Sequence, residues 1–396
     1  MPRKESKTKA AAGLGTIRKK EVNRNGKIYT YWEARYTAGF DPGTGKQIQR
    51  SITGKTQKIV AQKLKEATHA IDDGTYIAPS KMTVGEWLDI WRKEYLGGIK
   101  KSTASTYEDK IRLYLKPNLG ALRLDTLAPY DIQSLYNKQS ESGLSPKTVK
   151  NTHTILHKAL KQAQACGYIR VNPCEACILP KINKKTLTPL DEVETKIFLN
   201  EIHGHRFEVL FTVTIFTGLR LGEVLGLMWN CVNFTSGTML IDKQLQLKKK
   251  SGGEYELVPT KNSKGRVISV APWVMQLLKD HKAKQIQQRM ATGTLWLNSG
   301  FVFTNEVGEH LHIRTVNKAY KKIVTKIGRP DARFHDLRHS YAVAAIRAGD
   351  DIKTVQGNLG HATAAFTLDV YGHVTDQMRA ASAARMDSYI KDILSL

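Results

Sequence analysis

Cysteines, acidic side chains and long apolar runs are all scarce in this sequence of 396 residues. Four cysteines are too few for a disulfide-built fold and are typical of a reducing compartment. Cys174 and Cys177 form one CxxC pair, whereas a structural zinc site would need a second pair or nearby histidines. His153 and His157 are possible partners, but we expect no metal. No apolar run reaches transmembrane length, and the N-terminus lacks a signal-peptide core. A cytoplasmic protein without a membrane anchor or a cofactor is therefore predicted.

The shortage of acidic residues leaves a large positive charge. Lys and Arg number 61 against 36 Asp and Glu, which gives a net charge of +25. The basic residues are spread along the whole chain, so a neutral enzyme with one basic tail is excluded. This charge implies a polyanionic partner, and double-stranded DNA fits it. A chain of this length can bury more than one core, and two or three domains are expected.

The first part of the chain predicts a small sheet and one helix after a basic, disordered start at residues 1–13. β-branched and aromatic residues indicate three strands, and a helical pattern follows them; the ranges are 16–22, 28–38, 46–53 and 56–71. Turn signals at 25–26 and 41–45 separate the strands. Such a sheet can enter a major groove, although a solvated sheet face with incidental charge is the alternative. The candidate DNA contacts are Arg18, Lys20, Trp32, Arg35 and Tyr36.

The next part, residues 81–180, predicts an all-helical domain. Apolar stripes recur in four stretches, at 87–96, 102–119, 129–140 and 145–167, and Ser145-Pro146 is a typical helix start. Five lysines are candidate phosphate contacts, although each alone is equally well explained as a solvated side chain. They are Lys100, Lys101, Lys147, Lys150 and Lys158.

The last part, residues 187–396, predicts a mainly helical α+β domain with a small antiparallel sheet. Helices are expected at 191–202 and 205–216, and Gly218 allows a tight turn that places Arg220 at the start of the next helix. Strands are expected at 239–247, 254–259 and 266–270, with Lys261 and Lys264 on the turn between the last two. The chain closes with an amphipathic tail helix whose apolar positions are Met378, Ala381, Met386, Ile390 and Leu394.

Six residues of this last domain suggest one chemistry when taken together. They are Arg220, Lys261, His335, Arg338, His361 and Tyr371. Guanidinium groups bind phosphate oxygens in pairs, and a phenol with a pKa of about 10 needs help to act as a nucleophile. The spacing of His335 and His339 also resembles a metal-ligand pair, but no HExxH pattern accompanies it. The set favours phosphoryl transfer to tyrosine without a metal.

Three segments carry a family resemblance. TGLRLGEVLGL, HDLRHSYA and LGHATAAFTLDVYGHV, in this order, resemble the signature boxes of the tyrosine recombinase or phage integrase family. The resemblance spans roughly residues 14–385 and is strongest to integrases of temperate phages and conjugative transposons. It implies an arm-type DNA-binding domain at 14–74, a core-binding domain at 81–180, and a catalytic domain at 187–396 that ends in the tail helix.

The resemblance also implies a role for each of the six residues. Tyr371 would attack the scissile phosphate to give a 3′-phosphotyrosine, while Arg220 and Arg338 would hold the non-bridging oxygens. His361 would donate to the same phosphate, and His335 would assist proton removal from the phenol. Lysine would protonate the departing 5′-oxygen. The family spacing, counted back from 266–270, favours Lys261 over Lys264 for this step.

The implied function is site-specific recombination that integrates and excises a mobile element. The implied partners are core and arm DNA sites, a homotetramer on two duplexes with exchange of the tail helix, an excision or directionality factor, and a DNA-bending protein. A Xer-type resolvase and a type IB topoisomerase share the chemistry but are disfavoured by the N-terminal block. A DNA-binding regulator would explain the charge but not the six residues.

Overall fold

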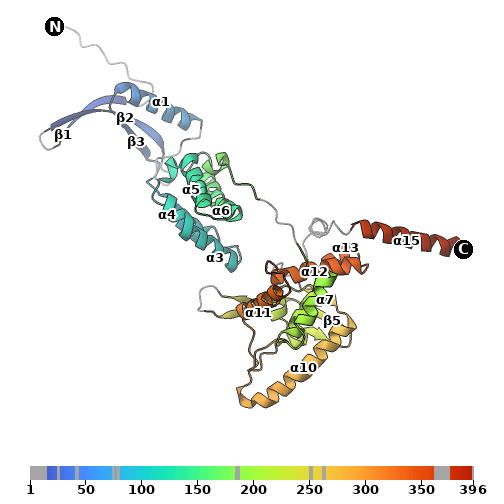
Figure 1. Ribbon diagram of the computed structural model, residues 1–396. Helices are drawn as coiled ribbons and strands as arrows, with labels where there is room; N and C mark the ends of the chain where they lie inside the picture. Colours follow the sequence, from blue (N-terminus) through green and yellow to red (C-terminus); the bar gives the residue numbers. More distant parts are fainter. Residues whose placement is uncertain are drawn as a thin grey trace, which may run out of the picture. The chain divides into compact units, whose positions relative to one another are not determined.

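The computed structural model describes residues 16–24, 27–40, 44–73, 76, 81–182, 188–248, 253–260, 265–360 and 375–394 (Figure 1). The chain forms two compact units, Met1–Asn183 and Lys184–Leu396. Within the described ranges, no helix is long and apolar enough to cross a membrane. The predicted start at 1–13 and the turn at 25–26 lie outside these ranges, as does most of the turn at 41–45.

The first unit begins with the predicted sheet. β1 (Thr16–Arg24), β2 (Lys27–Phe40) and β3 (Gln47–Gly54) form an antiparallel meander in the order β1-β2-β3. Helix α1 (Gln57–Asp72) begins at Thr56, whose side chain accepts a hydrogen bond from the Ile59 amide. The helix covers one face of the sheet and buries Val60 and Leu64 against Ala34. The predicted three strands and helix are confirmed.

The same unit continues as a helical domain, as predicted. Its elements are α2 (Val84–Glu94), α3 (Lys101–Lys110), η1 (Ile111–Leu115), α4 (Lys116–Leu119), η2 (Leu124–Thr126), α5 (Pro129–Glu141), α6 (Pro146–Ala165) and η3 (Pro173–Ala176). The predicted helix at 102–119 is interrupted by a wider π-helical turn at η1, immediately before α4. Pro117 cannot donate a backbone hydrogen bond, which accounts for a change of helical pitch there. Trp87 is fully buried and donates to the Ala159 carbonyl over 2.9 Å, so α2 is fastened to α6.

The second unit is mainly helical. Its helices are α7 (Glu192–Glu201), α8 (Glu208–Thr217), α9 (Leu221–Leu225), η4 (Trp229–Cys231), α10 (Pro272–Thr292), η5 (Gly293–Leu295), α11 (Ile313–Lys326), α12 (Phe334–Arg347), α13 (Ile352–Leu359) and α15 (Thr375–Leu394). An aromatic cluster of Phe198, Phe211, Tyr320 and Phe334 joins α7, α8, α11 and α12. The larger core around this cluster also includes Val224 of α9, so α9 and α12 are anchored in the same core.

The strands of this unit differ from the prediction. The expected strand at 239–247 is split at Asp242 into β5 (Thr238–Ile241) and β6 (Lys243–Leu247). β5 pairs with β4 (Val232–Asn233) and β8 (Arg266–Ser269), whereas β6 pairs with β7 (Tyr255–Pro259). The Asp242 carbonyl accepts from the Thr260 amide over 3.0 Å at the break between the two sheets.

This pairing changes the setting of the lysine segment. β7 and β8 are not hydrogen-bonded to each other. β7 belongs to the two-stranded sheet β6-β7, and β8 belongs to the three-stranded sheet β4-β5-β8. Lys261 and Lys264, which were predicted on the turn between these two strands, lie outside the described ranges.

Candidate active site and DNA-binding surfaces

The turn before α9 places Arg220 at the start of that helix, as predicted. α8 ends at Gly218, which has a left-handed backbone with φ +65°. A side chain there would also collide with its surroundings, because a Cβ atom would lie 2.5 Å from Tyr341 and 2.6 Å from Leu359. Glycine is thus required by both backbone conformation and packing. Arg220 follows in extended conformation and caps α9.

A buried carboxylate holds Arg220. Its Nη1 donates to Glu223 Oε1 over 2.7 Å, and its backbone amide donates to Glu223 Oε2 over 3.0 Å. Glu223 is only 1% exposed. A second arginine, Arg266 on β8, donates to both oxygens of the same carboxylate over 3.1 and 2.7 Å. One carboxylate therefore lies between two guanidinium groups.

The two arginines decide the charge state of Glu223. Burial raises the pKa of this carboxyl, but hydrogen bonds and charge from Arg266 and Arg220 lower it more, and the resulting pKa is about 2. Glu223 is therefore ionised at neutral pH. The trio carries one net positive charge, on the region that also holds His335 and Arg338.

Arg338 on α12 connects the first two signature boxes to the third. Its guanidinium is 1% exposed and donates to the carbonyls of Gly218, over 2.7 Å, and Leu359. Gly218 lies two residues before Arg220, and Leu359 is the last residue of α13. The structure therefore brings Arg220 and Arg338 into one site, although they lie 118 positions apart in the sequence.

His335 lies one helical turn before Arg338. Its ring packs edge-on against His339, with centroids 5.0 Å apart. Burial lowers the pKa of His335, and His339, Arg338, Arg220 and Arg333 lower it further, to about 4. The imidazole is therefore neutral at pH 7 and able to accept a proton.

Half of the predicted catalytic set is described by the structure. Arg220, His335 and Arg338 come together, as their shared electrostatics show. Lys261, His361 and Tyr371 lie outside the described residues, so their predicted roles stay predictions. The described chain reaches Gly360, immediately before His361, in a left-handed conformation that ends α13.

Two residues of this site, Glu223 and Arg266, are absent from the sequence prediction. Glu223 stands in the TGLRLGE motif three residues after the helix-starting arginine, and an acid at that position commonly caps a helix. This pattern could have identified Glu223 from the sequence. Arg266 had no local signal, because its partners lie 43 residues upstream and 92 residues downstream.

The open face of the N-terminal sheet carries a second group of predicted residues. Arg18, Lys20 and Arg35 surround the carboxylate of Glu33, with N–O separations of 2.9, 3.0 and 3.5 Å. This cluster lies on the face opposite α1, since Glu33 and Arg35 alternate with core residues along β2. It carries a net charge of +2, from three cations and one carboxylate.

Trp32 and Tyr36, two other predicted DNA contacts, pack toward α1 instead. Tyr36 is 5% exposed and shares a hydrogen bond with the Tyr76 hydroxyl over 2.8 Å. Side chains alternate along a strand, so the even-numbered positions of β2 face the helix and the odd-numbered positions face outward. Period-two alternation places these two aromatic residues in the core and leaves Arg35 outside.

The predicted lysines of the helical domain are exposed. Lys100 and Lys101 stand at the start of α3, and Lys147, Lys150 and Lys158 lie along α6. Lys158 also donates to the Tyr107 hydroxyl over 3.0 Å. The described parts of the chain, which include Cys174 and Cys177, contain no group of three or more His, Cys, Asp or Glu residues that could hold a metal ion.

Two family models match parts of this chain. The family model "Phage integrase family" matches residues 188–378, and "Phage integrase, N-terminal SAM-like domain" matches residues 83–140. The chain is 30% identical over 375 residues to the "Tyrosine recombinase XerC-like" protein of Caldanaerobacter subterraneus subsp. tengcongensis, covering 90% of this chain and 95% of that protein.

Two solved structures share the fold. The integrase of transposon Tn1549 in complex with a circular intermediate DNA has a TM-score of 0.65 at 22% identity, covering 77% of this chain and 99% of that one. A lambda integrase tetramer bound to a Holliday junction has a TM-score of 0.56 at 20% identity, covering 86% and 93%.

Proposed function

Since this chain belongs to the tyrosine recombinase, or phage integrase, family, we propose that its described arginine–histidine site cleaves and rejoins DNA with Tyr371 as the nucleophile. The protein is a tyrosine-type site-specific integrase of mobile elements, and its family transfers DNA strands without a metal. What is proposed concerns the residues that perform the reaction, the surfaces that bind DNA, and the assembly.

The convergence of Arg220, Arg338 and His335 carries the proposal. Two guanidinium groups in one site match the charge that develops on the non-bridging oxygens during phosphoryl transfer. Arg220 is oriented by Glu223, and Arg338 is oriented by two backbone carbonyls. Both groups are thus held in place before DNA arrives.

The remaining residues complete the reaction. Tyr371 attacks phosphorus, and its phenolic proton passes to the neutral imidazole of His335. His361 donates to the same phosphate, and Lys261 gives a proton to the departing 5′-oxygen. The bond from phosphorus to the 5′-oxygen breaks as the phosphotyrosine bond forms. A 5′-hydroxyl of the second strand reverses these steps and rejoins the DNA, so no external energy is needed.

Two further surfaces are proposed to bind DNA. The Arg18–Lys20–Arg35 cluster on the open sheet face would contact arm sites, because it is positive and lies away from α1. The lysines at the start of α3 and along α6 would contact the backbone of the core site. The domain limits 14–74, 81–180 and 187–396 are proposed on the same grounds.

The tail helix α15 is proposed to dock on a neighbouring protomer within a tetramer. Its apolar residues Met386, Tyr389, Ile390 and Ile393 are 46–62% exposed in the single chain, so they do not pack onto their own domain. An apolar helix face of this kind needs a partner. We propose a homotetramer on two duplexes, assisted by a directionality factor and a DNA-bending protein during excision.

Trapping of the covalent intermediate tests the proposal. The probe is a nicked suicide duplex that spans the joined ends of the mobile element encoding the protein. Wild-type protein should form a covalent protein–DNA complex, and should do so equally in EDTA. Tyr371→Phe should form none while binding the duplex normally. A covalent complex that persists in Tyr371→Phe, or one that requires Mg²⁺, would contradict the proposed chemistry.

The choice of lysine needs a separate assay. Each of Lys261→Ala and Lys264→Ala is tested on a duplex whose 5′-bridging oxygen is replaced by sulfur, a leaving group that needs no proton. The sulfur should restore cleavage to Lys261→Ala. If it restores cleavage to Lys264→Ala instead, the assignment must be exchanged.

A further inference from the structure

Arg266 makes contacts that join three separate segments of the catalytic unit. Its two Nη atoms donate to the oxygens of Glu223 on α9, and its Nε donates to the Asn358 carbonyl over 2.7 Å. The side chain itself starts from β8. It is 12% exposed, and Glu223 is 1% exposed, so solvent does not weaken these bonds.

The end of α13 is held by two arginines. The carbonyls of Asn358 and Leu359, the last two residues of the helix, accept from Arg266 and Arg338 respectively. Terminal carbonyls of a helix have no partner within the helix and carry partial negative charge, so guanidinium groups bind them well. Gly360 follows with φ +62°, and its missing Cβ leaves room for Arg266, whose side-chain atoms lie 3.2–3.4 Å from where that atom would be.

We infer that Arg266 is a positioning residue for DNA cleavage, which fixes Arg220 through Glu223 and fixes the end of α13 from which the segment carrying His361 and Tyr371 departs. This inference rests on the proposed role of Arg220. Arg266 touches no reacting atom. It acts by setting where Arg220 lies and where the third signature box begins.

The geometry explains why an arginine serves here. Guanidinium has a planar fork of N–H groups, so one side chain can satisfy both carboxylate oxygens and a carbonyl at once. Lysine would supply the charge without the fork. Without Arg266, the buried Glu223 would depend on Arg220 alone, and the carboxylate that orients Arg220 would take up a proton more readily and hold Arg220 less firmly.

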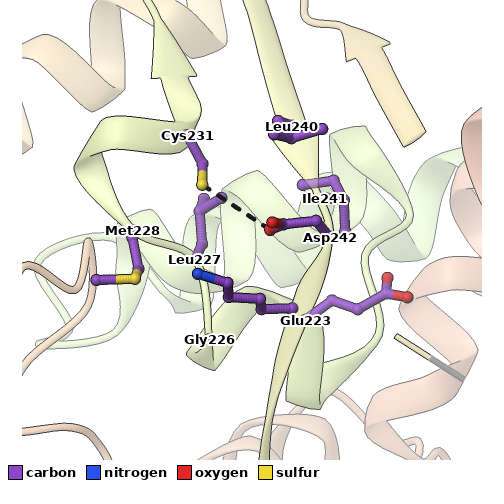
Figure 2. A pocket seen from close by; sticks show the side chains of 9 residues that line it. Glu223, Gly226, Leu227, Met228, Cys231, Leu240, Ile241 and Asp242 are labelled. Atoms are coloured by element: carbon purple, nitrogen blue, oxygen red, sulfur yellow. Dashed lines mark hydrogen bonds between the residues drawn. The ribbon is translucent and has the colours of Figure 1, made fainter. Parts of the chain in front are cut away.

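The surroundings of Glu223 make this role measurable through pH. In Figure 2 the side chain of Glu223 borders a small pocket, and its carboxylate points away from the side where Cys231 and Asp242 contact each other. Lys243 also lines that pocket. The charged groups on the carboxylate itself are Arg220 and Arg266. Removing Arg266 should therefore raise the pKa of Glu223, because only Arg220 would then oppose the effect of burial on this carboxyl.

The experiment measures the rate of covalent complex formation on the suicide duplex from about pH 5 to pH 8, with full-length protein. Arg266→Ala should be about a hundredfold slower at neutral pH, and the loss should deepen as pH falls and Glu223 takes up a proton. Arg266→Ala/Glu223→Gln should lose that pH dependence. Arg266→Lys should fall between Arg266→Ala and wild type. DNA affinity, measured by gel shift, should change less than about threefold.

Arg329 supplies the matched control. It likewise binds both oxygens of a carboxylate, Glu194, and a backbone carbonyl, that of Thr188. Arg329→Ala should lower the melting temperature yet leave the pH profile of cleavage unchanged. Should Arg266→Ala fail to fold, Arg266→Lys decides the question: it must melt within a few degrees of wild type and cleave at least about tenfold more slowly.

Three results would overturn the inference. They are wild-type cleavage by Arg266→Ala at every pH, wild-type cleavage by Arg266→Lys when Arg266→Ala does not fold, and a pH-independent loss in Arg266→Ala equal to that of Arg329→Ala. Arg220→Ala and Tyr371→Phe, assayed on the same duplex, separate this failure from failure of the proposed function. If those two variants also cleave, the site assignment itself is wrong.

Discussion

Two helices of the catalytic unit, α9 and α12, begin with the same local arrangement. Arg220 and Arg333 each stand just before the first turn, and each donates its backbone amide to an acid three residues later, over 3.0 and 2.8 Å. Each guanidinium also binds that acid, over 2.7 Å for Glu223 and 2.8 Å for Asp336. Local sequence therefore produces one motif twice.

The two copies differ in burial and in their further partners. The side chain of Arg333 is 63% exposed, whereas that of Arg220 is 28% exposed. Glu223 also binds Arg266, and among the interactions described here Asp336 has no second arginine. The α12 pair thus acts as a helix cap whose arginine lies at the surface, while the α9 pair lies inside a site. The comparison teaches that the packing around an arginine, more than its local motif, gives it a role in the reaction.

The largest difference between the two motifs is expected in the cleavage rate when each arginine is replaced. Arg220→Ala should slow covalent complex formation on the suicide duplex about a thousandfold, because a preorganised donor to the phosphate is lost. Arg333→Ala should change the rate less than about threefold, since an exposed ion pair contributes little. A comparable loss in both variants would break the distinction.

Removal of each acid should differ in stability. Glu223→Ala leaves two partly buried guanidinium groups without their carboxylate and should cost about 3–5 kcal/mol in the free energy of unfolding. Asp336→Ala removes a cap whose arginine can return to water, and should cost about 1 kcal/mol. Denaturant titration of both variants measures the difference. Equal costs would mean that burial does not distinguish the two pairs.

Low pH should reveal how much the ionised Glu223 contributes to the stability of the fold. Glu223 has a pKa of about 2 when folded, below its ordinary value of 4.5, so the unfolded chain binds the proton more tightly. The resulting stability is present above pH 4.5 and is lost as pH falls toward 2. Wild type should lose up to about 3 kcal/mol more than Glu223→Gln across this window. If the free energies of unfolding of the two proteins change in parallel with pH, the ionisation of Glu223 does not contribute to stability.

The smallest expected effect concerns the turn that leads into α9. Gly218→Ala should destabilise the protein by about 3 kcal/mol, because φ +65° and contacts with Tyr341 and Leu359 both oppose a side chain. Gly328→Ala is the control: that residue has φ +79° but open space around it, and should cost about 1 kcal/mol. Thermal melting compares them, and an equal shift would mean that the packing at Gly218 is unimportant.

Much of the architecture followed from periodic patterns in the sequence. The three N-terminal strands, α1 and the helical domain were predicted because each element carries its own spacing of apolar residues. The turn at Gly218 and the start of α9 at Arg220 were predicted because glycine allows a tight turn before a new helix. The motif order also placed Arg220, His335 and Arg338 in one site before any geometry was known.

Strand pairing and side-chain partners were beyond the reach of local patterns. The break at Asp242 depends on which segments β5 and β6 pair with, and those partners lie later in the chain. The inward position of Trp32 and Tyr36 was readable from alternation, but the choice of face depends on where α1 packs. Local charge and aromatic character alone pointed to the wrong side for these two residues.

The sequence by itself determined the kind of chemistry and the family, because guanidinium, imidazole and phenol groups in a fixed order have few alternative uses. Only the tertiary structure decided how Arg220 is held within that site. Burial removes water from Glu223, and a second arginine from β8 then replaces that water and connects α9 to the end of α13. No local pattern encodes such a contact, since it joins residues 43 and 92 positions apart.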